Sequence, residues 1–354
     1  MAREPLVLRI LLCTVVPLAA CSEPADRGAP AETVRALNLY NWSEYIPQEL
    51  LDEFAGRCRC PVTLATYESN EEMIAALEAG GVAKYDVVVP SDDAVPGMID
   101  RGLLAPLRKD NLPNLVNVEP RFLDPAYDPG NLFTVPYLYG TTGLYVRGSV
   151  PEELRTWGLV FDPALGGRSF TLIDSKRELI ALALLYLGLS PNSTVPTELA
   201  RAGALIEEAR PRSVGFYGGV EAKTLVVEGR VEVAMTYNGD ALRGTEELPD
   251  STYFVPREGA TLWMDNLAVP ARAPHRQVAE EFINFLLEPG AGARLANYNH
   301  TASPNRATLP AIEPADRANR VIYPSQAELA RLHLLANLGS DLALYDQLWK
   351  RLRP

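Results

Sequence analysis

The stretch LNLYNWSEYIP, residues 37–47, begins as a β-strand and ends in an unusual mixture of aromatic and carboxylate side chains. Leu37 and Leu39 would share one face of the strand, because successive side chains of a strand alternate between its two faces. Pro47 and the apolar residues after it predict a helix with proline in its first turn. Residues 42–45 therefore occupy a strand-to-helix connection, which is where ligands bind in open α/β sheets.

Strands and helices continue to alternate along the chain, which at 354 residues is longer than one ordinary domain. The short β-branched run VVV at 87–89 predicts a strand buried on both faces, as in a parallel sheet. We expect Asn70 to cap the helix that follows the second strand. Strands are predicted at 61–69, 85–91, 134–146, 169–175, 231–237 and 262–270, and helices at 70–81, 176–188, 196–210 and 275–289. The pattern predicts two α/β lobes.

The N-terminus predicts export. Residues 1–20 hold Arg3 and Arg9, then an apolar segment and two alanines, and this layout is typical of a secretory signal that is too short to span a membrane. The sequence LAAC, ending at Cys21, resembles the lipobox of bacterial lipoproteins, in which the cysteine is lipidated. The alternative is an ordinary signal that is cleaved near Cys21. Residues 21–35 lack an apolar period and suit a flexible tether.

Charge and cysteine content restrict the possible partners. The net charge of −12 argues against nucleic acid and anionic lipid surfaces as partners, and it is compatible with cationic ligands.

Cys58 and Cys60 are the only cysteines beyond Cys21, and we expect them on a strand, where they could bind a metal or form a disulfide. The chain has three histidines and no third ligand near this pair, so we expect neither, and no metal or cofactor.

Aromatic and carboxylate side chains occur together at the ends of several predicted strands. A ring face attracts an organic ammonium ion, and a carboxylate accepts its N–H hydrogen bonds. Each desolvated cation–π contact contributes about 2 kcal/mol at best, so specificity would depend on the buried carboxylates. The residues of this kind are Trp42, Glu44 and Tyr45 in the first such segment, Tyr237 and Asp240 in the second, and Trp263 and Asp265 in the third, with Glu178 at the start of a helix.

Several specific segments spread over most of the chain resemble those of the spermidine/putrescine-binding proteins, the extracytoplasmic receptors of polyamine ABC importers. These segments are LNLYNWSEYIP, TYESNEEM, YDVVVPS, VPYLYGTTG, NSTVP, VPREGATLWMDNLAVP and FINFLLEP. The resemblance implies an α/β fold, the two-lobed type II periplasmic binding protein fold, with the ligand in a cleft between the lobes. We expect one lobe to comprise residues 36–140 and 264–309, and the other to comprise residues 141–263 and 310–354.

The resemblance also implies a set of residues that line the cleft. They are Trp42, Ser43, Glu44, Tyr45, Ser91, Glu178, Tyr237, Asp240, Trp263 and Asp265, with Asp93, Ser175, Thr301 and Leu335 as further candidates. The resemblance also implies that Glu44 and Asp265 bind one end of a dication and that Glu178 and Asp240 bind the other end. Tyr237 replaces a tryptophan that is usual in the family, and Thr301 replaces a tyrosine.

Together these features predict a monomeric, membrane-anchored lipoprotein outside the cytoplasm, which binds a polyamine and delivers it to an ABC permease. It would contact the membrane through its lipid alone. Asp240 and Leu335 match the putrescine-preferring branch of the family, whereas Asp93 could serve a third amine of spermidine. One alternative is a polyamine sensor that acts on a signalling partner. Another is a secreted hydrolase, since paired carboxylates serve glycoside hydrolases, but the sequence has no nucleophile elbow, zinc motif or P-loop, so we expect no enzyme.

Overall fold

The computed structural model describes residues 35–165 and 167–353. The predicted signal at 1–20, the predicted lipidation site Cys21 and all of the tether except residue 35 lie outside these described residues. In the part of the chain that is described, no helix combines the length and the apolar character needed to cross a membrane.

The described strands form one mixed sheet, whose hydrogen-bonded order is β2-β1-β3-β9-β4-β7-β5-β6, with β10 beside β9 and β8 beside β4. The strands are β1 (Leu37–Trp42), β2 (Val62–Tyr67), β3 (Val87–Val88), β4 (Thr134–Arg147), β5 (Phe170–Ile173), β6 (Phe216–Tyr217), β7 (Val233–Tyr237), β8 (Ser251–Phe254), β9 (Ala260–Ala268) and β10 (Leu332–His333). The predicted strands are therefore present, although β3 is much shorter than the run that predicted it.

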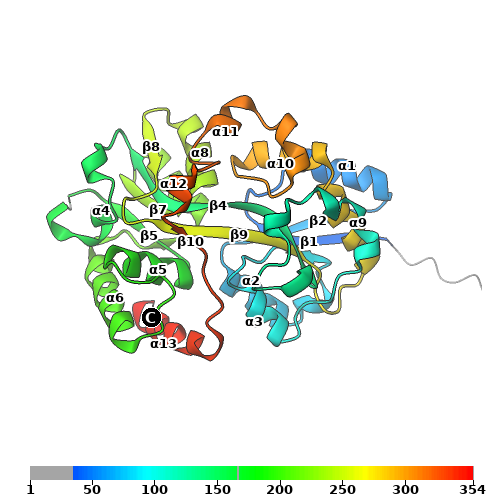
Figure 1. Cartoon of the computed structure of the whole chain (residues 1–354), viewed down its shortest axis with the longest axis horizontal. Coiled ribbons are helices and arrows are strands. Elements are labelled where there is room, and N and C mark those ends of the chain that lie inside the picture. Colours follow the sequence, from blue (N-terminus) through cyan, green and yellow to red (C-terminus); the bar gives the residue numbers. More distant parts are fainter. Residues whose placement is uncertain (1–34, 166, 354) are drawn as a thin grey trace, which may run out of the picture. The chain divides into compact units, whose positions relative to one another are not determined.

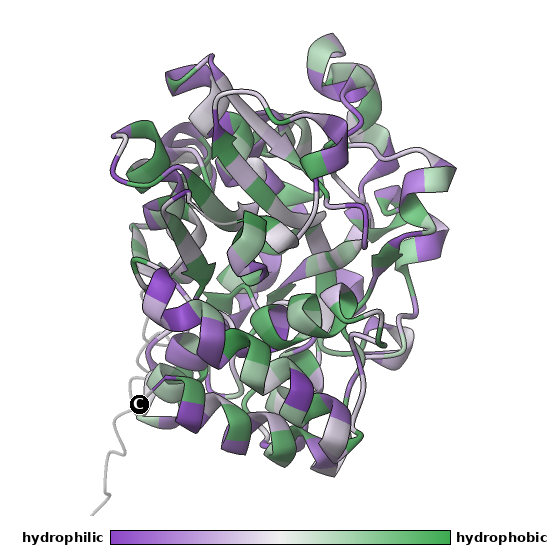
Figure 2. Cartoon of the chain, turned by 90° about the vertical axis from the view of Figure 1, so that its left-hand side faces the viewer, coloured by the Kyte–Doolittle hydropathy of each residue, from purple (hydrophilic) through white to green (hydrophobic). Residues whose placement is uncertain are grey.

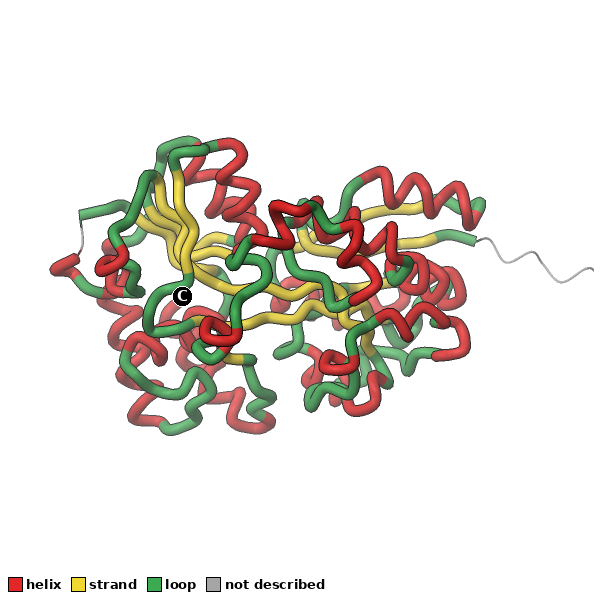
Figure 3. The backbone as a smooth tube through the Cα atoms, turned by 45° about the horizontal axis from the view of Figure 1, so that its top comes forward, coloured by secondary structure: helices red, strands yellow, loops and turns green. Residues whose placement is uncertain are grey.

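Strand direction agrees with the sequence pattern at the first strands and differs in the middle of the sheet. β1 pairs in parallel with β2 and β3, as the alternation of strands and helices predicts. The long strands β4 and β9 instead run antiparallel to each other, and they pass side by side through the centre of the molecule (Figures 1 and 3). These two strands connect the two halves of the sheet.

Helices cover the sheet in two groups, one around β1 and one around β5 (Figure 1). The first group includes α1 (Gln48–Cys58), α2 (Asn70–Glu78), α3 (Val95–Asp100), α9 (Arg276–Leu286) and α10 (Pro289–Asn299). The second includes α4 (Gly158–Phe161), α5 (Lys176–Tyr186), α6 (Pro196–Ala209), α7 (Gly219–Val227), α8 (Asn238–Glu247) and α13 (Leu342–Leu352). The short helices α11 (Pro314–Ala318) and α12 (Gln326–Leu329) belong to the connection that leads to α13.

Two large hydrophobic cores define the two lobes. The first core combines α1, α9 and α10 with β1, and the second combines α4, α5, α6 and α13 with β5 and β7. β4 contributes Leu138 to the first core and Leu144 to the second, and β9 likewise contributes Leu267 and Ala260. Because the same two strands enter both cores, they form the link between the lobes. The exact residues at which each lobe begins and ends stay a prediction, and Ile312 packs in the first core, just beyond the predicted end of that lobe at 309.

Helix termini differ in detail from the sequence-based expectations. Pro47 precedes α1 as its N-cap, with extended backbone, instead of lying in its first turn. Ser69, not Asn70, caps α2, because its hydroxyl accepts a hydrogen bond from the Glu72 amide at 3.2 Å. The surface helices carry hydrophobic and hydrophilic residues along their length (Figure 2). This is the amphipathic pattern that predicted them, since the apolar face of such a helix is buried in the protein core.

The expectation for Cys58 and Cys60 is wrong in two respects. Cys58 is the last residue of α1 and Cys60 lies in the turn before β2, so the pair is not on a strand. The two residues form a disulfide. Arg59 between them has a left-handed backbone, with φ at 52°, and ends the helix there.

Candidate functional site

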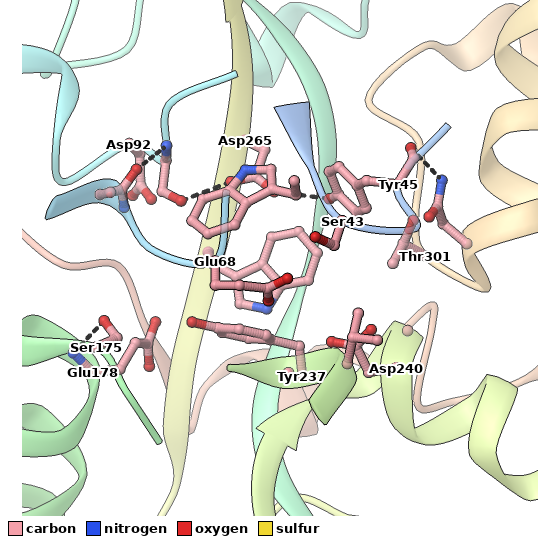
Figure 4. A pocket seen from close by; sticks show the side chains of 18 of the residues that line it. Ser43, Tyr45, Glu68, Asp92, Ser175, Glu178, Tyr237, Asp240, Asp265 and Thr301 are labelled. Atoms are coloured by element: carbon pink, nitrogen blue, oxygen red, sulfur yellow. Dashed lines mark hydrogen bonds between the residues drawn. The ribbon is translucent and has the colours of Figure 1, made fainter. Parts of the chain in front are cut away.

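A single cavity between the two lobes gathers nearly all of the residues predicted to bind a ligand (Figure 4). Its walls come from the ends of β1, β3 and β7, the starts of α5 and α8, the middle of β9 and the chain after α10. Of the predicted residues, those that line it are Trp42, Ser43, Tyr45, Ser91, Asp93, Ser175, Glu178, Tyr237, Asp240, Trp263, Asp265, Thr301 and Leu335. Glu44 is the predicted residue that does not line it.

Asp265 provides a buried carboxylate on the central strand. The Ser91 hydroxyl donates a hydrogen bond to its Oδ1, and the Tyr45 hydroxyl donates one to its Oδ2, both at 2.7 Å. Burial raises the pKa of Asp265 to about 7, although the two hydroxyl hydrogen bonds oppose the shift. Asp265 and Trp263 lie within β9 and not at a strand end as predicted, because this strand continues from one lobe into the other.

Glu178 provides a second buried carboxylate, in the first turn of α5. Ser175 caps this helix and accepts a hydrogen bond from the Glu178 amide at 3.5 Å. The Thr261 hydroxyl donates to the Glu178 carboxylate. Burial raises the pKa of Glu178 to about 7, and the neighbouring Asp93 adds to the rise. The pKa of Asp93 is itself raised by burial.

Asp240, in the first turn of α8, differs from these two carboxylates because a cation already binds it. The Nη2 of Arg243 donates a hydrogen bond to its Oδ1 at 2.6 Å. Glu44 belongs to the same cluster, since its Oε2 lies 3.8 Å from both Lys223 Nζ and Arg243 Nη2. The Glu44 side chain is half exposed, and it does not line the cavity.

The carboxylates are therefore arranged differently from the predicted pairs. Asp265 meets the hydroxyl of Tyr45 and not the carboxylate of Glu44. Glu178 and Asp240 lie on opposite sides of the Tyr237 ring (Figure 4). Asp265 and Glu178 are thus bonded by hydroxyl groups, whereas Asp240 is bonded by arginine.

Aromatic rings form the walls between these carboxylates. The indole N–H of Trp42 donates to the Val89 carbonyl at 2.9 Å, which fixes that ring at the end of β1. The rings of Tyr237 and Trp263 meet edge to face, with their centroids 5.8 Å apart. Buried carboxylates next to ring faces can bind an organic ammonium ion by charge-assisted hydrogen bonds and cation–π attraction.

Sequence reasoning missed several residues of the cavity. Glu68, just after β2, lies in front of the rings, and burial raises its pKa (Figure 4). Asp92 is buried and accepts a hydrogen bond from the Met264 amide at 3.2 Å. Both could have been suspected, since Glu68 follows a strand and Asp92 stands next to Asp93 after another. Arg243 was missed because a cation does not fit the predicted chemistry, although it lies one helical turn after Asp240.

A cavity between two α/β lobes that are linked by two shared strands is the arrangement expected of an extracytoplasmic solute-binding protein. Residues 49–318 match the family model for bacterial extracellular solute-binding proteins. The chain belongs to this family, and within it to the spermidine/putrescine-binding periplasmic proteins. Members of the family are solute-binding transport proteins and not enzymes.

Individual relatives support this assignment over nearly the full chain. The spermidine/putrescine-binding periplasmic protein of Escherichia coli is 32% identical over 328 residues, covering 92% of this chain and 94% of the relative. The putrescine/cadaverine-binding protein of Pseudomonas aeruginosa is also 32% identical, over 341 residues, covering 92% and 96%. A solved Listeria monocytogenes structure, described as a spermidine/putrescine ABC transporter, matches with a TM-score of 0.83 and 33% identity, covering 90% of this chain and 99% of that one.

Proposed function

We propose that this protein binds a linear polyamine in the cavity between its lobes, and that it binds putrescine more tightly than spermidine. The observation that carries the proposal is the pair of buried carboxylates, Asp265 and Glu178, which are bonded by hydroxyl groups and stand beside aromatic rings. The names of the relatives point to the same ligand class, since they include spermidine, putrescine and cadaverine.

In the proposed complex, carboxylates and aromatic rings contact different parts of the ligand. The two ammonium groups of a diamine would each donate charge-assisted hydrogen bonds to a carboxylate, Asp265 for one and Glu178 for the other. The methylene groups between them would lie against Trp42, Tyr237 and Trp263, and burying each methylene contributes about 0.8 kcal/mol.

Delivery of the ligand to an ABC importer is part of the same proposal. The relatives with this domain arrangement include components of ABC transporters, and the chain covers nearly their whole length. We propose that the protein acts as a monomer outside the cytoplasm, where its closed cleft would be recognised by permease subunits.

The ligand class is tested by calorimetry on protein that has been unfolded and refolded to remove any bound ligand. Putrescine, cadaverine, agmatine, spermidine and spermine are titrated separately. We expect one site per chain, with putrescine tighter than spermidine. Equal affinity for the two would contradict the putrescine preference, and the absence of binding for every polyamine would overturn the proposed function.

Membrane attachment is a further part of the proposal and concerns residues outside those described. We propose that cleavage before Cys21 leaves a lipidated cysteine, followed by the polar tether at 21–35. The exported wild-type protein would then partition with membranes, and the Cys21→Ala variant would remain in the aqueous fraction. Equal partitioning of the two after export would show that LAAC is not a lipidation site.

A further inference from the structure

We propose that Arg243 determines the ligand specificity of this cleft, by occupying Asp240 as a built-in cation and so denying that end of the cleft to a ligand ammonium group. The proposal rests on the proposed function, since it assumes that the ligand is a polyamine. It names the feature that would restrict the cleft to short diamines. An additional ammonium group of a longer polyamine would meet the guanidinium if it lay beside Asp240.

The guanidinium of Arg243 is held by three separate parts of the chain. Its Nη2 donates to Asp240 Oδ1 at 2.6 Å, one helical turn earlier in α8. Its Nη1 donates to the Glu44 carbonyl at 2.9 Å and to Asn299 Oδ1 at 3.2 Å, at the ends of β1 and α10 respectively. Arg243 lines the cavity, yet its side chain is only 13% exposed. These contacts fix the cation at one end of the cleft.

The carboxylates of the cleft therefore offer different sites to a cation. Asp265 and Glu178 accept hydrogen bonds from hydroxyl groups, and within the described residues neither forms an ion pair. Asp240 is paired with Arg243, and Lys223 places a second buried cation nearby, with Nζ 2.9 Å from Glu247 and 3.8 Å from Glu44. A ligand ammonium ion would find a free carboxylate at Asp265 or Glu178, and it would meet like charge at Asp240.

Displacement of Arg243 by a ligand is unfavourable for a related reason. Its Nε is already buried without a hydrogen-bond partner among the described residues. A guanidinium that also lost Asp240 would keep only the half-exposed carboxylate of Glu44, 3.8 Å away, and a mostly buried charge without a close partner is costly. The ligand must therefore fit the cleft with Arg243 in place.

The test compares putrescine and spermidine binding by calorimetry in wild type, Arg243→Gln and Arg243→Lys. Loss of the positive charge in Arg243→Gln frees Asp240, so we expect the ratio of spermidine affinity to putrescine affinity to rise at least about tenfold. Arg243→Lys keeps a cation and should keep the wild-type ratio. Arg243→Met serves as a second neutral variant in case Arg243→Gln does not fold.

The double variant Arg243→Gln/Asp240→Asn separates specificity from a merely structural role. Because it has no free carboxylate at this end, the gain for spermidine should disappear. The inference is overturned if the neutral variants change both affinities by the same factor, or if the gain persists without Asp240. Failure of the proposed function gives a different result, namely that no polyamine binds to wild type or to any variant.

Discussion

Two carboxyl groups of the cleft, those of Asp265 and Glu178, have a pKa of about 7 because they are buried in the protein without ligand. A carboxyl group whose pKa is raised holds its proton in the folded protein at a pH where it would otherwise be ionised. An ammonium ion binds the ionised form. Ligand binding and proton release are therefore coupled at these two residues.

This coupling predicts that putrescine binds more weakly as the solution is acidified. Well below the pKa, each carboxyl that must lose its proton weakens binding by about tenfold per pH unit. Calorimetry between about pH 8 and pH 5.5 should show this loss, and titrations at about pH 6 in buffers of different ionisation enthalpy should show protons released on binding. An affinity that is constant over this range would mean that neither carboxyl binds the ammonium groups.

For individual residues, the sequence predicted the chemistry of the side chains better than the directions in which they point. Aromatic and carboxylate residues near strand ends were sufficient to predict most of the cavity wall. The prediction that Glu44 lines the cavity was wrong. Its backbone is left-handed, with φ at 50°, and its carboxylate faces Lys223 and Arg243. Those two cations are distant in sequence, so no local pattern around Glu44 could have indicated them.

At the scale of elements, the cleft depends on the close approach of β4 to β9 and α8. Gly140 of β4 lies opposite Trp263 of β9 in the antiparallel register. A Cβ atom at Gly140 would lie 2.1 Å from Asn238 Oδ1 and 2.4 Å from the Trp263 ring. Both distances are far below van der Waals contact, so only glycine fits here without displacing the cavity wall.

Replacing Gly140 with alanine should therefore reduce stability and ligand binding together. Overpacking of this kind typically costs about 1–3 kcal/mol of unfolding free energy, and displacement of Trp263 should weaken polyamine binding. Urea unfolding and calorimetry measure the two effects. Gly56→Ala is the matched control, because no heavy atom lies within 4 Å of its Cβ position in α1. There we expect stabilisation of up to about 1 kcal/mol, and equal effects at both sites would contradict the packing argument.

The existence of most elements followed from the sequence, whereas the roles of β4 and β9 did not. Their apolar patterns predicted strands, and the alternation of β1, α1 and β2 predicted parallel pairing. Nothing in the pattern of a single strand reports its direction or its partner. The antiparallel pairing of β4 with β9, and their passage from one core to the other, required the three-dimensional structure.

At the scale of the whole molecule, both lobes contribute to one cavity, and polar contacts cross between them. Arg243 of the second lobe donates to the Glu44 carbonyl of the first at 2.9 Å, and Lys176 Nζ lies 3.6 Å from Glu71 Oε1. A ligand that bonds to Asp265 and Glu178 at once would favour the state in which the lobes are close together. A ligand shifts such an equilibrium by the difference in its affinity for the two states.

We therefore expect small-angle scattering to give a smaller radius of gyration with saturating putrescine than for ligand-free protein. The ligand-free sample should be prepared by unfolding and refolding, and its lack of ligand checked by mass spectrometry. The Asp265→Asn variant, measured at the same putrescine concentration, is the control for changes unrelated to the site. An identical radius with and without bound ligand would argue against closure of the lobes.

The most direct test of the account is a titration of putrescine into ligand-free wild type and Asp265→Asn. Removing one partner of a buried charge pair costs about 3–5 kcal/mol, which corresponds to about two to four orders of magnitude in Kd. Asp100→Asn makes the same chemical change at an exposed position at the end of α3 and should bind like wild type. We predict one putrescine site in wild type and in Asp100→Asn, with binding weakened about a hundredfold or more in Asp265→Asn. Absence of putrescine binding in wild type, or equal affinity in all three proteins, would contradict the account.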